Sequence, residues 1–151
     1  NEMDDFSSKP GEPNAYGLIG NSANAIEPNK RMLSSMSPTI VESPNGDLLV
    51  VGSPGGSTII TTTAQIIMNV IDFSMNIEDA VEAPRFHHQW LPDVIQLEEM
   101  RFSYETIKSL KDKGHEIQYR KSIGEANCIQ VKSGLIFGAA DSRRNSSAIG
   151  Y

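Results

Sequence analysis

A pair of glycines, Gly55 and Gly56, stands between a predicted buried strand and a predicted helix. The strand is the apolar run 48–51, and the helix covers 58–73, where apolar residues recur at helical spacing. Glycine permits backbone angles that other residues resist, and the first amides of a helix have no partner within it. Such a turn can bind an anion, or the oxyanion that develops during acyl transfer. The alternative is a plain strand-to-helix connection in which glycine serves only packing.

Two polar pairs could hold a charged substrate beside this turn. Ser34 and Ser35 are adjacent hydroxyls that could bind a carboxylate, or could form a helix cap or a turn. Asp4 and Asp5 could capture a substrate ammonium group, or form the solvated acidic surface that charge runs usually make. The arginine pair at 143–144 is interpreted as a surface pair, or as a salt bridge that ties down the end of the chain.

Other catalytic motifs are incomplete around the glycine pair. Ser53 stands on a strand-to-helix turn, where the nucleophile of a serine hydrolase would stand. The G-x-S-x-G pattern requires glycine two places earlier, where this chain has Val51. Pro54 also lacks the N–H that the residue after the nucleophile gives to the oxyanion hole. No Lys-Ser or Lys-Thr follows the glycines, so a phosphate-binding P-loop is excluded as well.

Histidine and cysteine are not spaced as metal ligands. His87 and His88 are adjacent, and neighbouring side chains on an extended chain point to opposite faces. His115 is isolated, and no further His or Cys stands at ligand spacing. We therefore expect a structural role for the histidine pair, no metal and no cofactor. Cys128 has small and apolar neighbours and is expected to be a small core residue.

The composition limits the class of protein and of partner. With 151 residues, 38% apolar and 21% charged, the chain is expected to form a single globular domain over 1–151. The net charge of −6, without a cluster of Lys or Arg, excludes a nucleic-acid partner. No apolar run has the length of a membrane span, so no membrane segment is expected.

The remaining pattern predicts an α+β fold. Pro44-Asn-Gly-Asp47 is a strong hairpin signal, so a strand at 39–42 should pair antiparallel with the strand at 48–51. This hairpin would bring Ser34, Ser35 and the glycine pair to one end of a sheet. Further helices are predicted over 76–82 and 103–113, and further strands over 93–97, 116–119, 127–132, 135–139 and 147–151.

Several strings resemble motifs that occur, in this order, in the γ-glutamyltranspeptidase family. The strings are NEMDDFS at 1–7, MLSSMSPT at 32–39, GSPGGS at 52–57, APRFHHQWLP at 83–92 and GAADSRR at 138–144. The resemblance spans essentially the whole chain. It implies an N-terminal-nucleophile (Ntn) hydrolase with an αββα sandwich of antiparallel sheets. Such an enzyme is made as a proenzyme that cuts itself into a large and a small subunit.

The resemblance also implies roles for particular residues. Asp5 matches the acid that pairs with the α-amino group of the γ-glutamyl unit, and Glu2 stands where the family places Glu or Gln for the same purpose. Ser34–Ser35 match the hydroxyls that bind the α-carboxylate, and Gly55–Gly56 match the backbone donors of the oxyanion hole. The nucleophilic threonine of the family lies upstream of NEMDDFS and is absent from these 151 residues.

The chain is therefore identified by resemblance as most of a small subunit. The intact enzyme would transfer the γ-glutamyl group of glutathione or a related amide, by way of a γ-glutamyl-threonine ester. The alternatives are a related Ntn acylase or poly-γ-glutamate hydrolase, and a non-catalytic homologue that acts as a binding module. The expected partners are the large subunit and the upstream part of the small subunit, and the expected location is periplasmic or extracellular. Alone, the chain is expected to be inactive and to self-associate.

Overall fold

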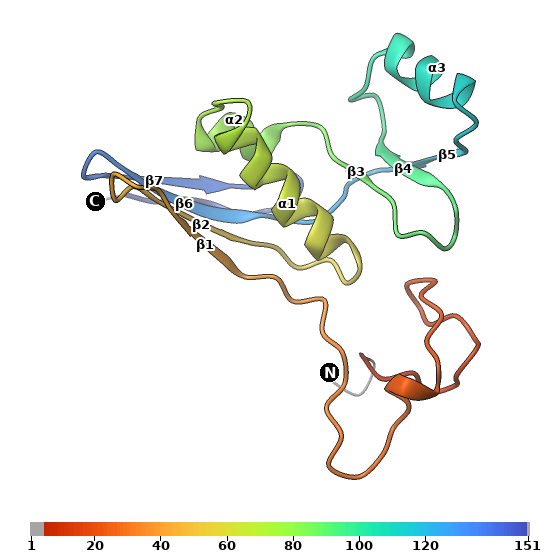
Figure 1. Cartoon of the computed structure of the whole chain (residues 1–151). Helices are drawn as coiled ribbons and strands as arrows, with labels where there is room; N and C mark the ends of the chain where they lie inside the picture. Colours follow the sequence, from red (N-terminus) through yellow and green to blue (C-terminus); the bar gives the residue numbers. More distant parts are fainter. Residues whose placement is uncertain (1–4, 151) are drawn as a thin grey trace.

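The computed structural model describes residues 5–150 and shows helices packed on an antiparallel sheet, in agreement with the predicted α+β class. Helices α1 (Thr58–Ile71) and α2 (Ile77–Glu82) cover one face of this sheet (Figure 1). Its four strands, in spatial order, are β1 (Thr39–Glu42), β2 (Leu48–Gly52), β6 (Asn127–Lys132) and β7 (Leu135–Ala140).

The first two strands form the predicted hairpin. Ile40 lies opposite Val50, and the turn closes with a hydrogen bond from the Ser43 N–H to the Asp47 carbonyl oxygen. Gly46 has φ +83°, a left-handed conformation that glycine adopts without steric strain. The second hairpin, β6–β7, turns at residues 133–134, as predicted.

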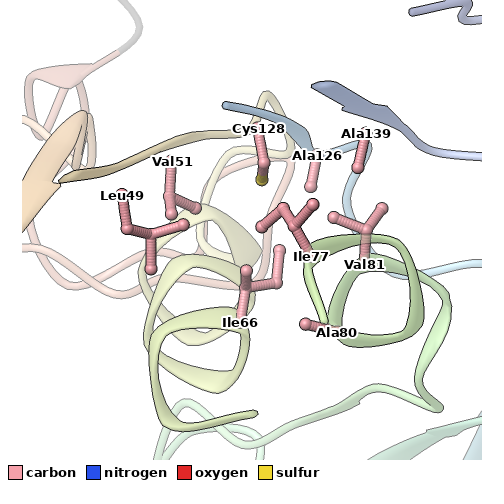
Figure 2. Close-up of a cluster of buried hydrophobic side chains, with 9 residues drawn as sticks. All are labelled: Leu49, Val51, Ile66, Ile77, Ala80, Val81, Ala126, Cys128 and Ala139. Atoms are coloured by element: carbon pink, nitrogen blue, oxygen red, sulfur yellow. The ribbon is translucent and has the colours of Figure 1, made fainter. Parts of the chain in front are cut away.

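The core lies between the sheet and the two helices. Because strand side chains alternate, one face of the sheet points into this layer, and Figure 2 shows Leu49, Val51 and Cys128 facing Ile66 and Ile77. Cys128 is buried, which confirms it as a core residue, and burial raises the pKa of its thiol to about 11. The thiol therefore stays protonated and is a weak nucleophile.

The opposite face of the same sheet is apolar and largely exposed, although Ala148 of the C-terminal segment lies against it at Gly138. Ile40, Ile129 and Ile136 alternate with the core residues and are 71%, 48% and 75% exposed. The chain thus supplies one sheet and its helical layer, while the outer face of the sheet carries side chains suited to a further layer.

Three shorter strands form a second sheet: β3 (Phe86–His87), β4 (Ile95–Glu98) and β5 (Ile117–Arg120). The pairing of β4 with β5 is parallel, because α3 (Tyr104–Asp112) carries the chain back between them. This pair departs from the antiparallel pairing that we expected throughout. The sheet lies to one side of the four-stranded sheet, with β3 in contact with α1 (Figure 1).

The C-terminal end of the chain differs from the prediction. Residues 147–150 form no strand, so that prediction is wrong for the part of 147–151 that the structure describes. Ile107 and Leu110 of α3 are half-buried only, since little of the described chain packs against this helix. No helix among residues 5–150 has the length and apolarity needed to cross a bilayer.

Candidate functional site

One cavity of about 770 Å³ lies where the segment 5–36 meets the start of α1. Its lining includes Asp5, Ser34, Ser35 and Gly56, which come from three separate parts of the sequence. The hairpin brings Ser34–Ser35 and the glycine turn to the same end of the sheet, as its geometry predicted. Gly55 adjoins the lining residues along the chain, and Glu2 lies outside the described residues.

The glycine turn has the backbone conformation that glycine alone adopts readily. Gly55 has φ +141° and Gly56 has φ +58°. The Gly55 carbonyl oxygen accepts hydrogen bonds from the N–H and the hydroxyl of Thr58, at 3.1 and 2.9 Å, which fix the start of the helix. Neither glycine N–H donates a hydrogen bond to another described residue. These amides are therefore available at the positive end of the α1 dipole.

Tyr16 packs directly on this turn. A Cβ atom placed on Gly56 would clash with the Tyr16 ring, so a larger residue here requires the ring or the turn to shift. The side-chain amide of Gln89 donates a hydrogen bond of 3.0 Å to the Tyr16 carbonyl oxygen and holds this loop in place. Phe6 is buried, and together the two aromatic residues attach the N-terminal segment.

The serine pair lies in extended chain before β1 and caps no helix. The Ser34 hydroxyl oxygen accepts a hydrogen bond of 3.2 Å from the Met36 N–H, which is the turn interpretation of this residue. This bond leaves the hydroxyl proton of Ser34 free to donate. The half-buried Ser35 hydroxyl makes no hydrogen bond to another described residue. Both hydroxyls can therefore donate to a carboxylate in the cavity.

Asp5 is half-buried and lines the cavity. Its main-chain carbonyl oxygen accepts a hydrogen bond of 2.7 Å from the side-chain amide of Asn24. A carboxylate at this position supplies the negative charge that an ammonium group requires. Asp4, the other member of the acidic pair, lies outside the described residues.

The histidine pair has protein partners for its ring nitrogens. Nδ1 of the buried His87 lies 2.8 Å from the Thr61 hydroxyl, and Nε2 lies 2.9 Å from Oε1 of Gln89. His88 bonds to Asp93 at 3.0 Å. These contacts fit the structural role expected of the pair, although both histidines also line the cavity. Within residues 5–150, no three His, Cys, Asp or Glu side chains are grouped to hold a metal ion.

A buried ionic network is the main feature that the sequence did not reveal. Arg85 and Asp141 pair at 2.6 Å, and Arg143 joins Asp141 at 3.1 Å and also contacts Glu98. All four side chains are almost completely buried. For Arg143, the surface interpretation is wrong and the salt-bridge interpretation is confirmed, whereas Arg144 is exposed.

Hydrogen bonds keep the two acids of this network ionised. Burial by itself would raise the pKa of Asp141, but the Ala126 N–H and the charge of Arg85 lower it below its ordinary value. Burial likewise opposes ionisation of Glu98, whose pKa is lowered by Arg143 and by the N–H groups of Arg85 and Ile123. The network joins the end of β7 to β4 and to the loop after α2.

Comparisons with known proteins agree with this geometry. Residues 1–151 match the family described as Gamma-glutamyltranspeptidase. The chain is 53% identical to a glutathione hydrolase proenzyme of Escherichia coli K12, over 95% of this chain and 25% of the relative. The chain thus spans about a quarter of the length of this relative and of the two similar proenzymes from Pseudomonas.

Two solved structures give the same result. The T380A mutant of Helicobacter pylori gamma-glutamyltranspeptidase superposes with a TM-score of 0.90 and 54% identity, over 95% of this chain and 80% of that chain. The Pseudomonas nitroreducens enzyme complexed with L-DON gives a TM-score of 0.91 and 42% identity, over 100% of this chain and 80% of that chain. These structures have the Ntn-hydrolase fold. The chain belongs to the γ-glutamyltranspeptidase family.

Proposed function

We propose that this chain forms the substrate-holding and oxyanion-binding part of an enzyme that transfers or hydrolyses γ-glutamyl groups, as from glutathione. The observation that carries the proposal is the single cavity lined by Asp5, Ser34, Ser35 and Gly56. The α-carbon end of a γ-glutamyl unit is a zwitterion, so its site needs an anion for the ammonium and donors for the carboxylate. Asp5 supplies the first, and Ser34–Ser35 supply the second.

The reacting carbonyl lies at the other end of the glutamyl chain. In the proposed complex its oxygen points to the amides of Gly55 and Gly56, which have no other partner among the described residues. Fixed donors stabilise the negative charge that develops on this oxygen, and removal of one such donor typically costs about 2.7–4 kcal/mol of transition-state stabilisation. The attacking threonine belongs to the part of the protein upstream of this chain, so the isolated chain is expected to be inactive.

The missing partner is proposed to cover the open face of the four-stranded sheet. Ile40, Ile129 and Ile136 form an apolar surface there. The Escherichia coli proenzyme is about four times as long as this chain, which leaves ample chain for a further layer and a large subunit. Export to the periplasm or the cell exterior is part of the same proposal, and fractionation of cells that express the full-length protein tests it.

Substitution of Asp5 in the full-length, processed protein tests the proposed function. Asp5→Asn removes the charge that binds the ammonium, so kcat/KM for γ-glutamyl p-nitroanilide should fall about 10- to 160-fold, from the loss of about 1.5–3 kcal/mol. The matched control is Asp72→Asn, an exposed acid at the end of α1. Equal activity of the Asp5 variant and the control, or a full-length protein that turns over acyl amides without an α-amino group equally well, would contradict the proposal.

A further inference from the structure

The side chain of Asn24 bridges the two segments that carry the substrate-holding residues. Its amide nitrogen donates a hydrogen bond of 2.7 Å to the Asp5 carbonyl oxygen, and its oxygen accepts one of 3.0 Å from the Leu33 N–H. Leu33 immediately precedes Ser34. We propose that Asn24 is a positioning residue that sets the separation between the ammonium-binding acid and the carboxylate-binding hydroxyls. This inference rests on the proposed function.

The partners of Asn24 fix the orientation of its amide group. A carbonyl oxygen can only accept and a main-chain N–H can only donate, so each end of the amide has one possible role here. The main-chain oxygen of Asn24 also accepts a hydrogen bond of 2.9 Å from the Ser7 N–H. The side-chain amide also donates a longer hydrogen bond of 3.4 Å to the Ser7 hydroxyl. Asn24 therefore contacts residues 5–7 at three points, two through its side chain and one through its backbone.

This bridge is the polar connection between the two halves of the site. Within residues 5–150, no hydrogen bond joins the segment 5–8 directly to the segment 33–36. Asp5 lies in 3-10 conformation, whereas residues 6–8 and 33–36 lie in no helix or strand. A zwitterion with a fixed distance between its charged groups is recognised well only when the protein groups keep a matching distance. Asn24 is the residue placed to keep it.

The test compares Asn24→Ala with a matched control in the full-length, processed enzyme. The control is Asn21→Ala, which removes a local hydrogen bond from the Ala23 N–H in the same loop but touches neither segment. Two substrates are used: γ-glutamyl p-nitroanilide, and glutaryl p-nitroanilide, which lacks the α-amino group. Because the charged end of the substrate binds alike in the ground and transition states, the loss should appear in KM.

The expected result is a substrate-dependent loss. Asn24→Ala raises KM for the γ-glutamyl substrate about 10-fold with kcat changed less than about 2-fold, and lowers kcat/KM for the glutaryl substrate less than about 3-fold. Asn21→Ala leaves both within about 2-fold of the wild type. If Asn24→Ala lowers the yield of folded enzyme, Asn24→Asp replaces it, since this variant keeps the acceptor for Leu33 and loses the donor to Asp5. It should show the same substrate dependence.

Three outcomes overturn the inference, and they are distinguishable. If Asp5→Ala discriminates between the two substrates and the Asn24 variants lower kcat/KM equally for both, Asn24 is only structural and the proposed function stands. If Asp5→Ala itself fails to discriminate, the ammonium is not bound at Asp5, and the proposed function fails together with the inference. A loss at Asn21→Ala as large as at Asn24→Ala also counts against a specific positioning role.

Discussion

The guanidinium of Arg85 lies 2.6 Å from the carboxylate of Asp141, and both side chains are buried although 56 positions separate them in the sequence. Asp141 also accepts hydrogen bonds from the Ala126 N–H and from Arg143. The pair thereby joins the loop before β3 to the end of β7. Breaking a buried pair leaves the remaining charge without a partner, which is strongly destabilising.

Removal of Asp141 should therefore lower the stability of the protein severely. Asp141→Ala is expected to reduce the free energy of unfolding by about 3–5 kcal/mol, because Arg85 and Arg143 lose their shared acceptor. Urea denaturation of the full-length protein measures the change. Arg144→Ala is the matched control, since this exposed side chain lies 3.9 Å from Glu125 and should change stability by less than about 0.5 kcal/mol. A loss at Asp141 no larger than at Arg144 would contradict this account.

The same network predicts a loss of stability in acid. The folded pKa values of Glu98 and Asp141 are lowered, so each contributes stability that is fully present above the unfolded carboxyl pKa of about 4. This contribution is lost as the pH falls through the folded pKa values. The urea midpoint should fall between pH 5 and pH 3, and the fall should be smaller for Glu98→Gln, which has no carboxyl group to titrate there. Identical pH dependence of the two proteins would show that Glu98 does not contribute.

Substitution of Gly56 should impair catalysis more than it impairs folding. Gly56→Ala places a Cβ against the Tyr16 ring and a side chain at φ +58°, so the turn must shift and its amide must move. We expect kcat/KM of the processed enzyme to fall at least about 10-fold, as for loss of an oxyanion donor. Gly46→Ala is the matched control, because Gly46 has φ +83° but nothing within 4 Å of a Cβ. That variant should lose about 1 kcal/mol of stability and keep its activity. Equal activity of the two variants would contradict a role for the Gly56 turn.

The open sheet face predicts self-association of the isolated chain. Ile40 and Ile136 are 71% and 75% exposed on the outer face of the four-stranded sheet. Exposed apolar surface of this kind drives association. Sedimentation velocity should show oligomers that Ile40→Lys and Ile136→Lys together convert towards monomer. Met100→Lys is the matched control, because this fully exposed residue lies in the turn after β4, outside the four-stranded sheet. A clean wild-type monomer at high concentration would refute the prediction.

The features that the sequence predicted correctly depend on local signals. The hairpin signal at 44–47 and the start of the helix at 76 act over two to four residues, and the structure confirms both elements, with the Asn76 side chain accepting from the Asp79 N–H at 2.8 Å. The cap at Ser103 is confirmed in the same way. The hairpin explains why the serine pair lies near the glycine turn. Its first strand begins at the end of the sheet where its second strand ends.

The features that the sequence did not predict depend on distant partners. The strand β3 has two residues and exists by pairing with β4, and the network of Arg85 has its acceptors in the last part of the chain. Asn24 had no signal of its own, because its partners lie 19 and 9 residues away. The predicted strand over 147–151 has no neighbouring strand to pair with in the described residues.

The central claim is that Asp5, Ser34–Ser35 and the glycine turn bind one glutamyl group together. A crystal structure of the full-length, processed protein with bound glutamate tests this most directly. The account predicts the ammonium within hydrogen-bonding distance of the Asp5 carboxylate, the α-carboxylate on the Ser34 and Ser35 hydroxyls, and the γ-carboxylate at the amides of Gly55 and Gly56. Glutamate bound with its ammonium away from Asp5, or in a different cavity, would contradict it.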